Sequence, residues 1–191
     1  MPTLADVERE ALVCTRCRLA GGRTQVVFGV GNPTADLVFV GEGPGEQEDR
    51  IGEPFVGRSG KFLDRLVLEE TGLTRADFYV CNVVKCRPPG NRDPLPDEIE
   101  SCRPYLESQL ELVGPSVVVT LGNFATRLLL STTEGITRLR GRAYPYRTGV
   151  LIPTYHPAAV LRSGGEAAAQ MRADLVRAKQ HLSAPSPQLA Q

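Results

Sequence analysis

Cysteine is the residue type whose spacing gives this 191-residue sequence its clearest capacity for chemistry. Two of its five cysteines, Cys14 and Cys17, lie in the segment LVCTRC with two residues between them. A C-x2-C pair supplies two sulfur ligands, which is at most half of a four-thiolate metal or iron–sulfur site. The cysteines at positions 81, 86 and 102 are therefore the candidates that would complete such a site.

Cys81 and Cys86 have different predicted environments. They are separated by NVVK within an expected strand, and strand alternation directs side chains at this spacing to opposite faces. Cys86 precedes the loop RPPGNRDP, which leaves it free to turn toward a metal, whereas Cys81 lies inside the apolar run FYVCNVV. Free cysteine is among the most buried residue types, so we predict that Cys81 is a core residue.

The candidate ligand set is therefore Cys14, Cys17, Cys86 and Cys102. Its spacing, C-x2-C followed by a long gap and C-x15-C, lacks the second C-x2-C pair that most zinc ribbons have. An iron–sulfur cluster suits four thiolates from distant segments, because its larger body spans elements that a tetrahedral zinc ion would have to draw together. The spacing favours a cluster, with a zinc ion and unliganded thiols as the alternatives.

The balance of basic and acidic residues excludes a strong electrostatic field from the net charge of the protein. The chain has 22 basic and 22 acidic residues and a pI near 6.7, so a polyanion would have to be bound by a local basic patch. The opening MPTLADVERE has neither the basic nor the apolar region of a signal peptide, and no window approaches the ~18 apolar residues of a membrane span. We expect a cytoplasmic protein with no membrane association, and a reducing cytoplasm disfavours structural disulfides.

The apolar pattern predicts strands that alternate with helices. Apolar runs typical of buried parallel strands lie at 35–42, 77–85, 116–122 and 150–156. Helical spacing is found at 3–13, 60–72, 95–114, 123–131 and 166–182. This alternation predicts a parallel sheet with helices on both faces. The length suits a single domain over residues 1–183, and the Pro-, Ser- and Gln-rich segment 184–191 is predicted to be a disordered tail.

Three polar side chains lie at the predicted carboxyl ends of strands, where ligands bind in open parallel sheets. Glu42 follows the first strand in GEGPGEQED, Asn82 stands at the second, and His156 ends the last. Each has an ordinary explanation, since GEGPG is also typical of a tight turn and a lone histidine is more often structural. A buried amide without hydrogen bonds costs several kcal/mol, so Asn82 either ties down a loop or faces a ligand. Convergence of all three favours a binding site.

The combined motifs resemble those of a known family. The segments are GEGPGEQED, PFVGRSGKFLD, NVVKCRPPGNRDPLPDE and TYHPAAVLR, together with the four candidate ligand cysteines. The set resembles the iron–sulfur, family-four uracil-DNA glycosylases over about Cys14 to Arg177, nearly the whole chain. The resemblance implies a three-layer α/β/α sandwich with a central, mostly parallel four-stranded sheet and a structural [4Fe-4S] cluster. It also implies excision of uracil from DNA to leave an abasic site, the first step of base-excision repair.

The resemblance also implies roles for individual residues. Glu42 and His156 would be catalytic, and the uracil site would consist of Gly41, Glu42, Gly43, Gln47, Phe55, Asn82 and His156. Phe55 would stack on the flipped base, and Asn82 would read its polar edge. Cleavage of an N-glycosidic bond builds positive charge on the sugar and negative charge on the leaving base. A carboxylate near C1′ would stabilise the positive charge, and a hydrogen-bond donor at O2 would stabilise the negative charge. These roles suit Glu42 and His156.

A base-flipping enzyme also needs contacts to DNA phosphates. Lys85 and Arg87 flank the cysteine-bearing loop and Arg162 follows the His156 segment, so we expect these three side chains to contact DNA. We expect uracil-containing DNA as the partner and a monomeric protein.

Two alternatives differ from this interpretation. The first is a non-catalytic iron–sulfur module for DNA binding or electron transfer, which would have no need of Glu42, Asn82 and His156 at one crevice. The second is a related glycosylase that acts on a different deaminated base. GEGPG with NVVKC is more similar to the uracil-specific iron–sulfur group, and the basic insertion of the DNA-trapping relatives does not follow Lys85.

Overall fold

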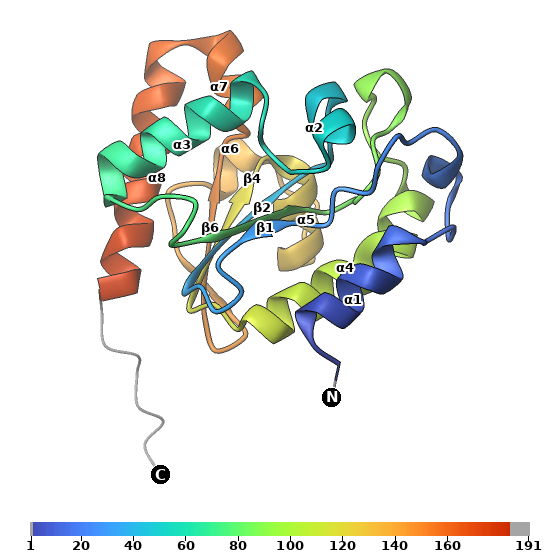
Figure 1. The fold of residues 1–191 in the computed structure, drawn as a ribbon. Helices are drawn as coiled ribbons and strands as arrows, with labels where there is room; N and C mark the ends of the chain where they lie inside the picture. The colour runs from blue at the N-terminus through green and yellow to red at the C-terminus, as the bar shows by residue number, and fades with distance from the viewer. Residues whose placement is uncertain (1, 184–191) are drawn as a thin grey trace.

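A mixed sheet forms the centre of the structure, a computed structural model that describes residues 2–183 (Figure 1). Its six strands have the spatial order β1-β3-β2-β4-β6-β5. The strands are β1 Val30–Gly31, β2 Leu37–Gly41, β3 Tyr79–Asn82, β4 Val117–Leu121, β5 Tyr144–Tyr146 and β6 Gly149–Thr154. The four central strands run parallel, whereas β1 and β5 pair antiparallel with β3 and β6 at the two edges.

The predicted fold class is confirmed, but the sheet has six strands where the sequence predicted four. The four predicted strands are the parallel ones. The edge strands were missed because β1 has two residues and β5 three, too few to produce a periodic pattern.

Helices cover both faces of the sheet and complete a three-layer arrangement (Figure 1). On one face lie α1 Leu4–Leu12, α4 Pro96–Val113 and α5 Asn123–Leu130; on the other lie α3 Arg58–Thr71, α7 Pro157–Ser163 and α8 Gly165–Ser183. Shorter segments are α2 Glu46–Ile51, α6 Ile136–Leu139 and the 3-10 turns η1 Arg18–Gly21 and η2 Pro89–Asn91. The five predicted helices are confirmed to within about two residues at each end.

Alternate side chains of β2 enter two separate apolar cores. Val38 and Val40 pack with residues of α1 and α4, whereas Leu37 and Phe39 pack with residues of α3 and α8. All four side chains are buried. A strand covered on both faces has no polar side, which explains why this segment is a continuous apolar run in the sequence.

The end of β3 differs from its predicted boundary. The strand stops at Asn82 instead of position 85, so strand alternation does not extend to Cys86. Cys81 and Cys86 belong to the same apolar core, and the prediction that they face opposite sides of a strand is wrong. Cys81 is nevertheless fully buried, which confirms its predicted place in the core.

Two further predictions concern the C-terminal segment and membrane spans. The segment 184–191, predicted to be disordered, lies outside the described residues. Between residues 2 and 183, none of the helices has the length and apolar character needed to cross a bilayer.

Candidate active site and cysteine cavity

A cavity of about 550 Å³ lies at the carboxyl ends of the parallel strands. Glu42 comes directly after β2, Asn82 is the last residue of β3, and His156 follows β6 by two residues. All three line this cavity, together with Gly43, Gln47 and Phe55. The parallel strands thus bring together the polar side chains that the sequence placed at their ends, as ligand sites in open sheets require.

Asn82 presents an atom without a partner to this cavity. Its side chain is 1% exposed, and among the described residues its Oδ1 is the one buried side-chain nitrogen or oxygen atom that lacks a hydrogen bond. Such an atom costs about 1–3 kcal/mol in a folded protein. Because Asn82 also lines the cavity, a ligand N–H is the natural donor to Oδ1.

Gly41 makes room for this arrangement. A Cβ atom at this position would lie 2.4 Å from Oδ1 of Asn82 and 2.5 Å from Cζ of Phe55. Gly41 does not itself line the cavity, but its missing side chain lets the amide and the ring come together. Gly43, one residue beyond Glu42, is similarly close to Val84, where a Cβ atom would lie 2.7 Å from a methyl group.

Phe55 is held in an unusual backbone conformation. Its φ of 54° lies in the left-handed region, a strain of order 1–3 kcal/mol for a bulky residue that the surrounding contacts must offset. Arg75 donates a hydrogen bond of 2.6 Å to the Phe55 carbonyl, and Gly60 approaches that carbonyl so closely that a Cβ atom would overlap it. The ring centroid lies 5.8 Å from that of His156. The ring is therefore a fixed wall of the cavity.

Glu48 organises the loop that carries Phe55. Its carboxylate accepts hydrogen bonds from the backbone N–H groups of Gly45, Val56 and Gly57 at 3.2, 3.1 and 2.9 Å. The side chain therefore ties the start of α2 to the segment that enters α3. Sequence reasoning missed this residue; the available signal was a glutamate three residues after Gly45, the spacing of a helix-capping carboxylate.

His156 is placed as a neutral hydrogen-bond donor. Its Nδ1 accepts the backbone N–H of Ala158 at 3.1 Å, in the first turn of α7. Burial lowers the pKa of His156 to about 4, and the positive charge of Arg162 acts in the same direction against the opposite effect of Glu48. With Nδ1 occupied as an acceptor, the proton of the neutral ring resides on Nε2. That N–H is the donor available to a ligand.

Glu42 is a carboxyl group with weakened acidity. Burial raises its pKa from 4.5 to about 7, and the negative charge of Asp93 adds to the effect. Asp93 also lines the cavity and was not identified from the sequence. Glu42 therefore exchanges its proton near neutral pH, where carboxyl groups in water are fully ionised.

The three side chains predicted to contact DNA differ in their exposure to solvent. Arg162 is exposed and lines the cavity, while Arg87 is partly exposed and donates a hydrogen bond of 2.7 Å to Oδ1 of Asn91. The interpretation of Lys85 as a phosphate contact is wrong, because its side chain is only 1% exposed. Arg58, exposed at the start of α3 and lining the cavity, was missed; its signal was its place after Gly57 in VGRSG.

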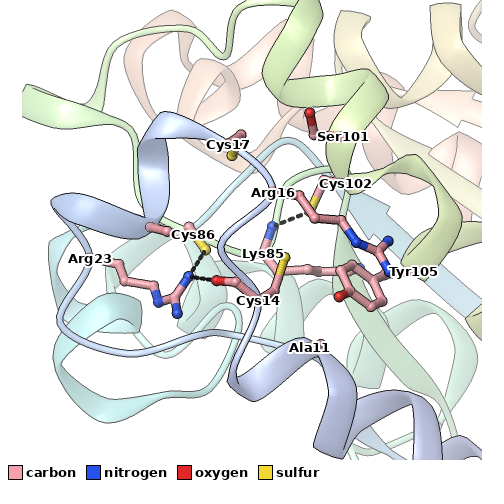
Figure 2. A pocket seen from close by; sticks show the side chains of 11 residues that line it. Ala11, Cys14, Arg16, Cys17, Arg23, Lys85, Cys86, Ser101, Cys102 and Tyr105 are labelled. Atoms are coloured by element: carbon pink, nitrogen blue, oxygen red, sulfur yellow. Dashed lines mark hydrogen bonds between the residues drawn. The ribbon is translucent and has the colours of Figure 1, made fainter.

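Four cysteines surround a second cavity, shown in Figure 2. Cys14 and Cys17 come from the segment between α1 and η1, Cys86 from the loop after β3, and Cys102 from α4. None of the four forms a disulfide. Between residues 2 and 183, no three His, Cys, Asp or Glu side chains gather closely enough to hold a single metal ion.

The surroundings of these sulfur atoms suit thiolates bound to a cluster. Arg23 donates to Sγ of Cys86 at 3.5 Å, and the backbone N–H of Lys85 donates to Sγ of Cys102 at 3.2 Å (Figure 2). Burial raises the pKa of the Cys86 thiol, and it raises that of Cys102 to about 11, whereas the hydrogen bonds from Arg23 and from the Lys85 backbone lower these pKa values and so favour the thiolate forms. Buried sulfur atoms that accept N–H bonds are the environment in which iron–sulfur ligands are held and tuned.

Residues 28–180 match the family described as the uracil DNA glycosylase superfamily, the class of protein that the fold and the cavity define. The chain is 44% identical over 169 residues to a type-4 uracil-DNA glycosylase of Sulfurisphaera tokodaii, covering 84% of this chain and 77% of the relative. It is 47% identical to that of Archaeoglobus fulgidus, covering 84% of both chains, and 48% identical to that of Thermotoga maritima, covering 78% and 79%. The chain belongs to the type-4 uracil-DNA glycosylase family.

Proposed function

We propose that this protein is a hydrolase that flips uracil out of DNA and cleaves its N-glycosidic bond, leaving an abasic site for base-excision repair. The observation that carries the proposal is the unpartnered Oδ1 of Asn82 in a cavity that also contains Glu42, Phe55 and His156. Family membership supports the same reaction.

Asn82 and Phe55 account for recognition of the base. Uracil has a donor at N3 and an acceptor at O4, so the amide of Asn82 matches it by accepting with Oδ1 and donating with Nδ2. Cytosine has an acceptor at N3 and a donor at N4, which reverses both positions. The Phe55 ring provides the stacking surface, and the absence of a side chain at Gly41 keeps it next to the amide.

Glu42 and His156 account for the chemical step. As the bond breaks, the sugar gains positive charge and uracil gains negative charge. Ionised Glu42 stabilises the sugar cation or orients the attacking water. Neutral His156 donates from Nε2 to O2 of the leaving base, and one such preorganised donor supplies about 3 kcal/mol. Gly43 and Gln47 complete the wall of the cavity around the base.

DNA phosphates are bound by arginine side chains near the cavity. Arg162 and Arg58 line it, and Arg87 lies on the loop that also carries Cys86. Flipping the nucleotide costs a few kcal/mol, which these contacts and stacking on Phe55 offset. We expect uracil-containing DNA to be bound by a monomer, with residues 1–183 acting as one domain in the cytoplasm.

Cys14, Cys17, Cys86 and Cys102 would hold a [4Fe-4S] cluster. Their common cavity and the N–H donors to two of the sulfur atoms support this assignment. When bound, the cluster supplies structural cross-linking between the N-terminal segment, the loop after β3 and α4. Cys86→Ser should therefore lose iron and stability, because the free energy of metal binding is also free energy of folding. Cys81→Ser, which alters a core cysteine outside that cavity, should keep its full iron content.

The decisive experiment uses an oligonucleotide with one uracil. Incubation with the protein followed by alkali should cut the strand at the uracil position, and a thymine oligonucleotide should stay intact. Glu42→Gln serves as the inactive control. Strand binding without scission would instead favour the non-catalytic iron–sulfur module.

A further inference from the structure

Lys85 carries a buried positive charge that the proposed reaction does not use. It is among the largest fully buried side chains of the described residues, with 1% exposure. Its ammonium group donates to the backbone carbonyl of Asn82 at 2.6 Å and to Oε1 of Gln109. Both acceptors are uncharged, although a buried ammonium is ordinarily balanced by an anion.

The candidate ligand cysteines beside Lys85 would become anions, as thiolates, when a cluster is bound. Lys85 lines the cysteine cavity and directly precedes Cys86 (Figure 2). Its own backbone N–H donates to Sγ of Cys102 at 3.2 Å. Four thiolates bring more negative charge than the iron–sulfur core neutralises, so a bound cluster would leave a net negative charge beside this ammonium.

Lys85 also connects that cavity to the base site. Gln109 lies on α4, the helix that supplies Cys102, and it donates to the Phe28 carbonyl at 2.8 Å and to the Tyr79 hydroxyl at 3.1 Å. Gln109 is therefore fixed, and through Lys85 it fixes the carbonyl of Asn82. The next residue continues this link, because the N–H of Val83 donates to the Gly41 carbonyl at 2.9 Å.

We propose that Lys85 is a positioning residue: its ammonium group balances the negative charge of the thiolate-bound cluster and fixes the backbone of Asn82 so that the side-chain amide faces uracil. This inference rests on the proposed function and on the proposed cluster. It assigns to Lys85 a role inside the protein in place of the phosphate contact expected from the sequence.

The test compares three variants with the wild-type protein, each purified anaerobically. Lys85→Met keeps the length of the side chain and removes both charge and donors. Lys85→Gln removes the charge but keeps an N–H donor. Lys179→Met is the matched control, because it removes a lysine charge from the exposed face of α8, outside both cavities.

Three measured quantities separate a positioning role from a merely structural one. The first is the reduction potential of the cluster, which should become more negative in both Lys85 variants because the reduced cluster loses a neighbouring positive charge. The second is single-turnover excision at saturating DNA, which should fall about tenfold in Lys85→Met and less in Lys85→Gln. The DNA concentration for half-maximal rate should stay within about twofold, since Lys85 does not touch DNA. Lys179→Met should match the wild type in all three quantities.

Each other outcome overturns the inference. A wild-type potential in both Lys85 variants would remove the electrostatic role, and a wild-type excision rate in Lys85→Met would remove the link to Asn82. Loss of folded protein in both variants, measured by circular dichroism, would reduce Lys85 to a structural residue. Failure of the proposed function is a separate result, because the wild-type protein itself would then release no uracil. The reduction potential of its cluster would still be compared with those of the variants.

Discussion

Replacing Glu42 with glutamine should stabilise the protein while it removes activity. In the folded protein, burial and Asp93 raise the pKa of Glu42 from 4.5 to about 7. The folded state therefore holds this proton more tightly than the unfolded state does. The stability contributed by protonated Glu42 is fully present below about pH 4.5 and is lost as the pH rises through about 7. Glutamine has no charge to desolvate and avoids this loss.

The magnitude follows from the same pKa. A rise from 4.5 to about 7 corresponds to about 3.4 kcal/mol for a fully buried group. Glu42 is partly exposed in the cavity, and solvent screening reduces this value to about 1–2 kcal/mol. For a protein of this size, Glu42→Gln should then raise Tm by about 2–8 °C at about pH 8. The gain should shrink to less than half at about pH 5, where Glu42 in the folded protein is protonated.

The assay is thermal unfolding of both proteins under anaerobic conditions at one scan rate, together with single-turnover excision at about pH 8. Excision should fall by about 10²–10³ while DNA affinity changes little, because the carboxylate acts as charge develops. Glu111→Gln, at an exposed position on α4, is the control and should change neither quantity. An equal Tm difference at both pH values would show that packing, and not ionisation, causes it and would refute the reasoning.

Three further outcomes are expected. His156→Ala should lower single-turnover excision by about 10²–10³ with unchanged DNA affinity, and weaker DNA binding with normal chemistry would assign His156 a structural role. Asn82→Asp should lose most uracil excision and gain slow cytosine excision, whereas Asn82→Ala should lose uracil excision alone; wild-type activity of the alanine variant would contradict its role as reader. Asp93→Asn removes a negative charge that raises the pKa of Glu42, so the acidic limb of the pH profile of kcat/KM should move to lower pH. An unchanged profile would mean that Asp93 does not act on Glu42 in the working enzyme.

The sequence predicted the parts of this protein that depend on periodic burial. The four parallel strands and the five long helices each bury a face over enough residues to produce a pattern, whereas β1 and β5 are too short to do so. The convergence of Glu42 and Asn82 was also predictable, because parallel strands end at one edge of a sheet. The role of Lys85 was not predictable. Nothing in its local sequence distinguishes a buried lysine that donates hydrogen bonds within the protein from an exposed one.

Some contributors to the cavity were hidden for a related reason. Asp93 acts on Glu42, which the folded loops bring near it, and in the sequence it looks like an ordinary surface carboxylate. Glu48 has the spacing of a helix-capping carboxylate after Gly45, but its bonds to Val56 and Gly57 depend on the folded loop. The unusual φ of Phe55 likewise depends on Gly60 and Arg75, which approach its carbonyl from α3 and from the segment that follows it. Contacts of this kind are properties of the tertiary structure.

The three hydrogen bonds of Glu48 have a consequence for local unfolding. They join the two ends of the segment 45–57 through one side chain, so displacement of this carboxylate breaks the contacts at both ends. Segments linked in this way open as one cooperative unit, which amide hydrogen exchange detects as a common protection free energy. The amides of Gly45, Val56 and Gly57 should therefore exchange together, and the stacking wall at Phe55 should be present or absent as a whole during each opening event.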